Sequence, residues 1–139
     1  VCEALNKVLK RIIKEPRPAG SYRVDSYGNP SDHAQIAACF ATFIVLLMLV
    51  RVWLPLWRKM IYMAISVGIA VLTAVSRVHQ GVHSVKQVTY GAVAGCLFGC
   101  IWFAIGHASS SLFRWLAQSG LGRFFYLRDS TNIQNVLLH

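Results

Sequence analysis

The fold of this chain follows from the sequence AQIAACFATFIVLLMLV at residues 34–50, an apolar run that contains no charged residue. Two more uncharged apolar runs follow, at 60–75 (MIYMAISVGIAVLTAV) and 88–105 (VTYGAVAGCLFGCIWFAI). A helix needs roughly 17–25 apolar residues to cross the hydrocarbon core of a bilayer. The sequence therefore predicts an all-α fold, a polytopic transmembrane helical bundle with spans at about 34–52, 60–75 and 88–105.

The composition favours the membrane over two other classes of protein. Of the 139 residues, 55% are hydrophobic and only 14% are charged, whereas ordinary soluble domains carry about 25% charged residues. Disorder requires low hydrophobicity and many charges, so it is excluded. Three long apolar runs in so short a chain also disfavour the remaining alternative, the buried helices of a soluble protein.

Basic residues outnumber acidic ones by 14 to 5, which gives a net charge of +9. Such a balance often indicates a nucleic-acid partner, because clustered Lys and Arg neutralise phosphates. Here the cations flank the apolar runs instead of forming one stripe. We therefore expect the membrane as a partner and no nucleic acid, while the oligomeric state stays open.

The length allows a single domain, which we expect at residues 1–128, followed by a C-terminal tail at 129–139. The chain begins at Val1 without an initiator Met, and we expect it to lack one or two N-terminal spans. Four cysteines show neither CxxC pairs nor the spacing of a zinc site, so we interpret them as small hydrophobic residues.

Three glycines in the last apolar run, Gly91, Gly95 and Gly99, recur every four residues and so share one helical face. Small residues on one face let the backbones of two membrane helices approach closely. The repeat therefore predicts a packing surface for a neighbouring helix, with a structural role and no chemical one.

Three successive spans also predict which polar segments meet. A helix that leaves one membrane face near His33 reaches the other face near Arg51, and the next helix returns to the first face at Ser76 and Arg77. The following loop, with His83, stays there until the third helix departs near residue 88. Segments far apart in the sequence are therefore expected on one membrane surface.

The groups expected on that surface have a shared chemistry. Arg presents a planar fork of donors that suits phosphate oxygens, and Lys adds a compact positive charge. Two histidines can divide the work of phosphoryl transfer, one as nucleophile and the other as proton donor to the leaving oxygen. Taken singly, a histidine at a helix start is more often a cap, and flanking cations more often meet lipid head groups.

Order and spacing carry more information than the single residues. Lys10-x6-Arg17-Pro18, then Pro30-Ser31-x-His33, then Ser76-Arg77-x5-His83 resembles the three-part signature of the type 2 phosphatidic acid phosphatase (PAP2) superfamily. KEPRP at 14–18, Tyr27-Gly28 ahead of the Pro-Ser motif and Leu127-Arg128-Asp129 in the tail are similar to the dolichyldiphosphatase branch of that superfamily.

The resemblance implies a role for each matching residue. His83 would be the nucleophile that forms a phosphohistidine, His33 the general acid for the leaving group, and Gln87 the residue that orients His83. The phosphate would be held by four side chains and one backbone amide: Lys10, Arg17, Ser31, Arg77 and the amide of Asp32. This scheme uses no metal and no cofactor, and His79 is the competing histidine in the same loop.

Two positions depart from the superfamily pattern. Asp32 stands where the superfamily usually has Gly, and a carboxylate there repels a diphosphate unless it is neutralised or points away. Gln87 stands where the superfamily usually has an Asp that orients the nucleophilic ring. Because Gln87 lies one helical turn beyond His83, its carbonyl can accept the Nδ1–H bond without supplying charge.

The implied activity is hydrolysis of a polyprenyl diphosphate, dolichyl in this branch, to the monophosphate and inorganic phosphate, which recycles the lipid carrier of N-glycosylation. The alternatives are a phosphatase of another lipid phosphate and a catalytically inactive membrane protein that binds lipid phosphates. The positive-inside rule, counted over the loops, puts the site in the cytosol. The resemblance implies the lumenal face of the endoplasmic reticulum membrane, which we adopt as the expectation.

Overall fold

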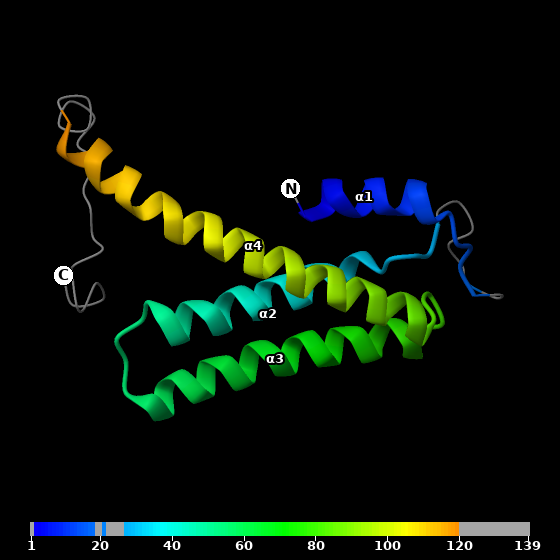
Figure 1. Cartoon of the computed structure of the whole chain (residues 1–139). Helices are drawn as coiled ribbons and strands as arrows, with labels where there is room; N and C mark the ends of the chain where they lie inside the picture. Colours follow the sequence, from blue (N-terminus) through cyan, green and yellow to red (C-terminus); the bar gives the residue numbers. More distant parts are fainter. Residues whose placement is uncertain (1, 19–20, 22–26, 120–139) are drawn as a thin grey trace. The chain divides into compact units, whose positions relative to one another are not determined.

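The computed structural model describes residues 2–18, 21 and 27–119 (Figure 1). Within these residues the chain forms four helices and no strand: α1 (Cys2–Ile13), α2 (Asp32–Val50), α3 (Leu56–His79) and α4 (Val85–Gln118). The predicted all-α fold is therefore confirmed. The chain divides into two compact units, residues 1–102 and residues 103–139, and the elements that carry the candidate site belong to the first.

Among the described residues, three helical segments are long and apolar enough to cross a membrane: Asp32–Val50, Leu56–His79 and Val85–Ser110. They extend past the apolar runs because charged residues join the end turns. At the start of α3, for example, the Arg58 guanidinium lies 5.0 Å from the centre of the Trp57 ring. Side chains of this kind cover apolar surface while their charged heads reach water, so the helical backbone continues beyond the hydrocarbon core.

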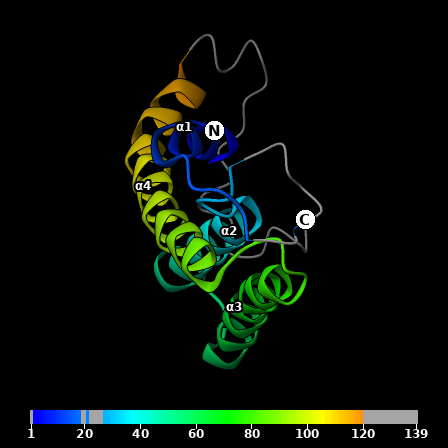
Figure 2. The same cartoon turned by 90° about the vertical axis from the view of Figure 1, so that its right-hand side faces the viewer.

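Helices α2 and α3 form an antiparallel hairpin, and they lie side by side in both views (Figures 1 and 2). A short connection joins them, since the Arg51 N–H still bonds to the Leu47 carbonyl and α3 begins directly after Pro55. No residue of α3 is buried within the described chain. Most of its large apolar side chains are exposed, as they are on a helix that faces lipid.

The seam between α2 and α4 is lined by the three glycines. A Cβ atom added to Gly91 would lie 2.6 Å from the Ser31 carbonyl oxygen, and one added to Gly99 would lie 2.8 Å from that of Cys39. One added to Gly95 would run into the Gln35 carbonyl. The predicted packing face is thus occupied by α2, and the close approach holds the first turns of both helices together.

Helix α1 is fixed to α2 by buried amides. Asn6, which is 2% exposed, donates from Nδ2 to the side-chain oxygen of Gln35 and to the Pro30 carbonyl at 3.4 Å. The helix ends at Ile13. The next residue, Lys14, has a φ of 49°, in the left-handed region, and its N–H bonds to the Lys10 carbonyl at 3.0 Å. This turn sends residues 15–18 back over the start of α2 and α4.

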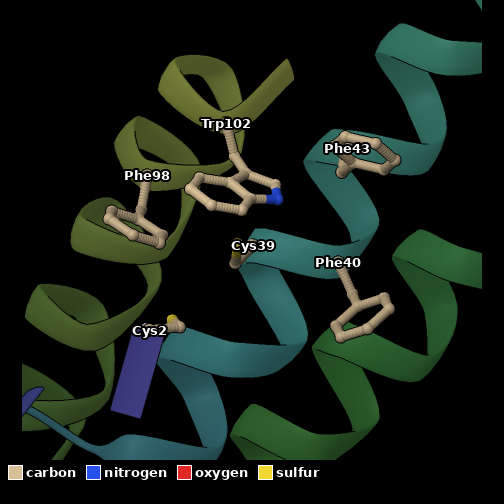
Figure 3. Close-up of a pocket in the computed structure, with 6 residues that line it drawn as sticks. All are labelled: Cys2, Cys39, Phe40, Phe43, Phe98 and Trp102. Carbon is tan, nitrogen blue, oxygen red and sulfur yellow. The ribbon is translucent and has the colours of Figure 1, made fainter. Parts of the chain in front are cut away.

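An apolar groove of about 380 Å³ lies between α1, α2 and α4 (Figure 3). It is lined by side chains from all three helices: Cys2, Cys39, Phe40, Phe43, Phe98 and Trp102. The Phe98 and Trp102 rings stack on α4 with centroids 6.2 Å apart. At 1.5 Å of rise per residue, the α2 part of the groove lies roughly 12–18 Å along the helix from Ser31.

Candidate active site

Contacts between remote segments gather at the end of the bundle where α2 and α4 begin. The Ser31 N–H donates to the Gln87 carbonyl at 3.2 Å, which joins the Pro-Ser motif to the first turn of α4. The Arg17 guanidinium donates to the Val82 carbonyl at 3.0 Å and lies 3.3 Å from His83 Nε2. Motifs separated by 65 or more positions in the sequence are thus in direct contact.

His83 is buried, with 4% of its surface exposed, and both ring nitrogens have defined partners. Nδ1 lies 2.9 Å from the Gly28 carbonyl oxygen and 3.3 Å from Gln87 Oε1. Both of these oxygens are acceptors only, so Nδ1 carries the proton. In the neutral ring, Nε2 then holds the free lone pair, and that lone pair faces the Nη1–H of Arg17.

Burial is the main reason that the pKa of His83 lies below its ordinary value. The positive charges of Arg17 and Lys10 lower this pKa further, while the hydrogen bonds to Gln87 and Gly28 oppose the shift. The imidazole is therefore neutral at neutral pH. A neutral ring is the form that can act as a nucleophile, once a bound phosphate draws the Arg17 guanidinium away from the Nε2 lone pair.

Gln87 is 2% exposed, and every polar atom of its amide is used. Its Oε1 also accepts the Ser84 N–H at 3.3 Å, and its Nε2 donates to the Pro16 carbonyl at 2.8 Å. The Gln87 N–H in turn donates to Ser84 Oγ at 3.2 Å. Ser84 and Gln87 thus form a capping box at the start of α4, which orients the Gln87 carbonyl toward His83 as its predicted role requires.

Lys10 and Asp32, both expected at the phosphate, form an ion pair with each other. The Lys10 side chain is 13% exposed and that of Asp32 is 36% exposed. The pair neutralises the carboxylate that departs from the superfamily pattern. It also occupies the Lys10 ammonium, which an anion has to draw away from Asp32 before it can bind there.

Ser31 and Arg77 contribute buried polar atoms with no hydrogen-bond partner among the described residues. Ser31 is 0% exposed, and its unpartnered atom is Oγ. The corresponding atom of Arg77, in the last turn of α3, is Nε. Leaving such a group buried and unpaired costs about 1–3 kcal/mol, so both atoms have donor capacity to offer an oxyanion.

The two remaining histidines of this end differ from His83 in exposure. His33 is the second residue of α2 and its side chain is exposed. His79 closes α3, is exposed, and lines an apolar recess of about 420 Å³ with residues such as Val78 and Val88. The predicted tail at 129–139 and its Leu127-Arg128-Asp129 motif lie outside the described residues.

Sequence reasoning missed the main-chain partners of the site. The carbonyls of Gly28 and Pro16 hold His83 and Gln87, and no side-chain pattern identifies such groups. The S-x-x-Q pattern at 84–87, by contrast, is a readable capping signal. Glu15, which contacts the Pro-Ser loop and α4, also had no role assigned. The described residues hold no cluster of three or more His, Cys, Asp or Glu side chains suited to a metal ion.

The model of the PAP2 superfamily matches residues 1–111. The chain belongs to the PAP2 superfamily. It is 33% identical to Dolichyldiphosphatase 1 of Rhinolophus ferrumequinum over 97% of this chain and 61% of that protein. It is 34% identical to Dolichyldiphosphatase 1 of Dictyostelium discoideum, over 97% of this chain and 62% of that protein. Lipid phosphate phosphatase gamma of Arabidopsis thaliana is 32% identical, over 99% and 63%.

This PAP2 chain spans about three fifths of the length of those relatives. No solved structure matches it. The membership confirms the resemblance inferred from the three motifs, and the three candidate spans agree with a multi-pass membrane protein.

Proposed function

We propose that this chain carries the phosphatase site of a membrane enzyme that hydrolyses a polyprenyl diphosphate, dolichyl diphosphate in particular, to the monophosphate and inorganic phosphate. The proposal rests on the contacts of the His83 ring. A buried neutral imidazole directs its Nε2 lone pair at a guanidinium, and its Nδ1–H is held by two carbonyl oxygens.

The proposed first step is attack by His83 Nε2 on the terminal phosphorus. A bond from Nε2 to phosphorus forms while the bond from phosphorus to the bridging oxygen breaks, and dolichyl phosphate leaves. The departing oxygen takes a proton from His33, and the Nδ1–H bonds to Gly28 and Gln87 stabilise the imidazolium that develops. The site as proposed uses no metal, since protein groups supply the positive charge.

The second step is hydrolysis of the phosphohistidine. His33, now neutral, takes a proton from a water molecule whose oxygen attacks phosphorus, and the bond to His83 Nε2 breaks. Inorganic phosphate leaves and both histidines return to their starting forms. Arg17, Arg77 and Ser31 would hold the equatorial oxygens through both steps, where charge is spread over them.

The groove between α1, α2 and α4 supports a lipid substrate (Figure 3). Its walls are apolar and aromatic, and α1 and α2 lead from it to the phosphate-binding end. A diphosphate at Ser31 with its chain along α2 would place the first isoprene units there. We further propose that the site faces the lumen of the endoplasmic reticulum and serves the recycling of the lipid carrier of N-glycosylation.

The decisive experiment is phosphate release by membranes that contain the chain. Dolichyl diphosphate should yield inorganic phosphate, and His83→Ala should lower the rate by about a thousandfold or more, as loss of a nucleophile does. Radiolabelled substrate should leave an acid-labile phosphohistidine on the wild type and none on the variant. His107→Ala is the matched control. An unchanged rate in His83→Ala contradicts the proposal, and phosphatidic acid as a better substrate redirects it to another lipid phosphate.

A second candidate, an inactive protein that binds lipid phosphates, is favoured by the Lys10–Asp32 pair. Asp32→Gly frees Lys10 and installs the residue usual in the superfamily. If the chain is an active enzyme, we expect kcat/KM to rise about fivefold, which corresponds to ~1 kcal/mol. Asp32→Asn is the control, because it removes the charge and keeps the side chain. If the wild type shows no turnover and Asp32→Gly does, the wild-type chain is an inactive protein that binds lipid phosphates.

A further inference from the structure

Glu15 lies where the three motif-bearing segments meet and belongs to KEPRP at 14–18, but the resemblance assigns it no role. Its carboxylate accepts a hydrogen bond from Asn29 Nδ2 at 2.7 Å, next to the Pro-Ser motif. The same oxygen lies 3.8 Å from the Lys86 ammonium in the first turn of α4. Its main-chain carbonyl accepts the Gly28 N–H at 2.8 Å. One residue thus ties the segment that bears Arg17 to the loop and to α4.

Two routes connect Glu15 to the proposed nucleophile. The first is the main chain of Gly28, whose N–H bonds to the main-chain carbonyl of Glu15 and whose own carbonyl accepts the His83 Nδ1–H. The second is the Gln87 amide, whose oxygen faces the same Nδ1 and whose nitrogen donates to the carbonyl of Pro16, the next residue after Glu15. Both neutral acceptors of His83 are therefore held by main-chain carbonyls, Gly28 by that of Glu15 and Gln87 by that of Pro16.

The negative charge of Glu15 can also stabilise a positive charge on His83, in addition to the structural contacts of the residue. His83 is faced by the cations Arg17 and Lys10, and its immediate acceptors, Gly28 O and Gln87 Oε1, carry no formal charge. Attack on phosphorus turns the ring into an imidazolium, which adds positive charge to a positive site. Asn29 is the main reason that the pKa of Glu15 lies below its ordinary value, with the amide of Gln87 and the charge of Lys86 adding to the shift. The carboxylate is therefore ionised at neutral pH.

We propose that Glu15 is the positioning residue of His83, which acts through the Gly28 peptide and the Gln87 amide and supplies the negative charge that Gln87 does not carry. This inference rests on the proposed function, because it needs His83 to become cationic during turnover. Glu15 touches neither phosphate nor His83 itself. Its carboxylate stabilises the imidazolium at a distance and contacts the Gln87 amide, while its main-chain carbonyl holds Gly28.

The test compares Glu15→Gln with the wild type in phosphate release from dolichyl diphosphate. Gln keeps an acceptor for Asn29 but removes the charge. We expect kcat to fall about tenfold, with KM changed little, because one unit of pKa is worth a factor of ten. The acidic limb of the kcat/KM profile, which reports His83, should move to lower pH by roughly half a unit to one unit, since a lost negative charge disfavours the imidazolium.

Two further variants make the result specific. Glu3→Gln makes the same change on α1, where Glu3 pairs with Lys7 on the exposed surface, and it should leave rate and profile unchanged. Glu15→Asp keeps the charge, so its acidic limb should return toward the wild-type position even if the shorter side chain weakens folding. Thermal unfolding of each variant separates loss of protein from loss of rate.

Each outcome bears on the proposal. An acidic limb that stays in place in Glu15→Gln, or that moves equally in Glu15→Asp, overturns the charge role of Glu15. A His83→Ala variant that keeps full activity instead overturns the proposed function, whatever Glu15 does. The two failures are therefore distinguishable in one set of membranes.

Discussion

The two histidines proposed for catalysis occupy opposite environments at one end of the same bundle. His83 is buried, and three polar groups hold its ring: Gly28, Gln87 and Arg17. His33 lies at the first turn of α2, beside the Lys10–Asp32 pair, and its side chain is exposed. The resemblance implies different roles for the two residues, and the structure gives them different surroundings, a fixed ring and an accessible one.

The difference fits the two proposed tasks. A nucleophile has to meet phosphorus along one direction, so a ring locked by hydrogen bonds avoids the entropic cost of orienting it. A general acid has to serve the leaving group in the first step and water in the second, which requires access to both. Burial also keeps His83 neutral through its lowered pKa, while the exposed side chain of His33 is accessible to the leaving oxygen and to water.

Between the exposed ring and the contacts that fix His83, the larger effect is expected from removing the exposed ring. His33→Ala should slow release of phosphate from dolichyl diphosphate by about 10²–10⁴, the usual contribution of acid–base catalysis. With p-nitrophenyl phosphate the leaving group needs no proton, so its first turnover should stay fast. We expect a burst of p-nitrophenolate equal to the amount of protein, followed by a stall at the phosphohistidine.

His79→Ala is the matched control for this experiment, since His79 is also an exposed histidine at this end of the bundle. It should retain nearly full activity with both substrates. If His79→Ala loses as much rate as His33→Ala and shows the burst, the general acid is His79. If neither variant shows a burst, the proposed division of roles between His83 and His33 is wrong.

The membrane fold was predictable from the sequence because apolar runs and glycine spacing are local signals. The three runs predicted the spanning helices, and Gly91, Gly95 and Gly99 predicted the seam that α2 now occupies. Counting membrane crossings predicted that the Pro-Ser motif and the His83 loop share one end of the bundle, where the Ser31 N–H bonds to the Gln87 carbonyl. These inferences need only the period of a helix and the thickness of a bilayer.

The electrostatic detail was not predictable in the same way. Every residue has a carbonyl, so the selection of Gly28 and Pro16 as partners depends on how the loop folds over α4. The pairing of Lys10 with Asp32 likewise depends on how α1 packs on α2, which the buried contact of Asn6 with Gln35 fixes. Side-chain roles can be read from motifs, but main-chain roles require the tertiary structure.

A smaller effect is expected from a substitution at Gly28, which tests the contacts that hold the buried His83 ring. A Cβ atom there would lie 2.8 Å from both polar atoms of the Gln87 amide. The far end of a glutamine normally swings aside, but this one is tied to Ser84, Pro16 and His83. Gly28→Ala should therefore displace the acceptor of Nδ1 and lower kcat about tenfold to a hundredfold, because misplacement by 1 Å can cost about 10²-fold.

Gly68→Ala is the control for this change, because a Cβ atom there meets nothing within 4 Å, and it should leave kcat unchanged. Phosphate release measures the rate, and thermal unfolding shows whether either variant loses folded protein. The phosphohistidine should form slowly in Gly28→Ala and still be hydrolysed through His33. A wild-type rate of phosphohistidine formation in Gly28→Ala means that the Gln87 carbonyl is not needed at Nδ1, and the contrast between the fixed and the accessible ring then loses its physical basis.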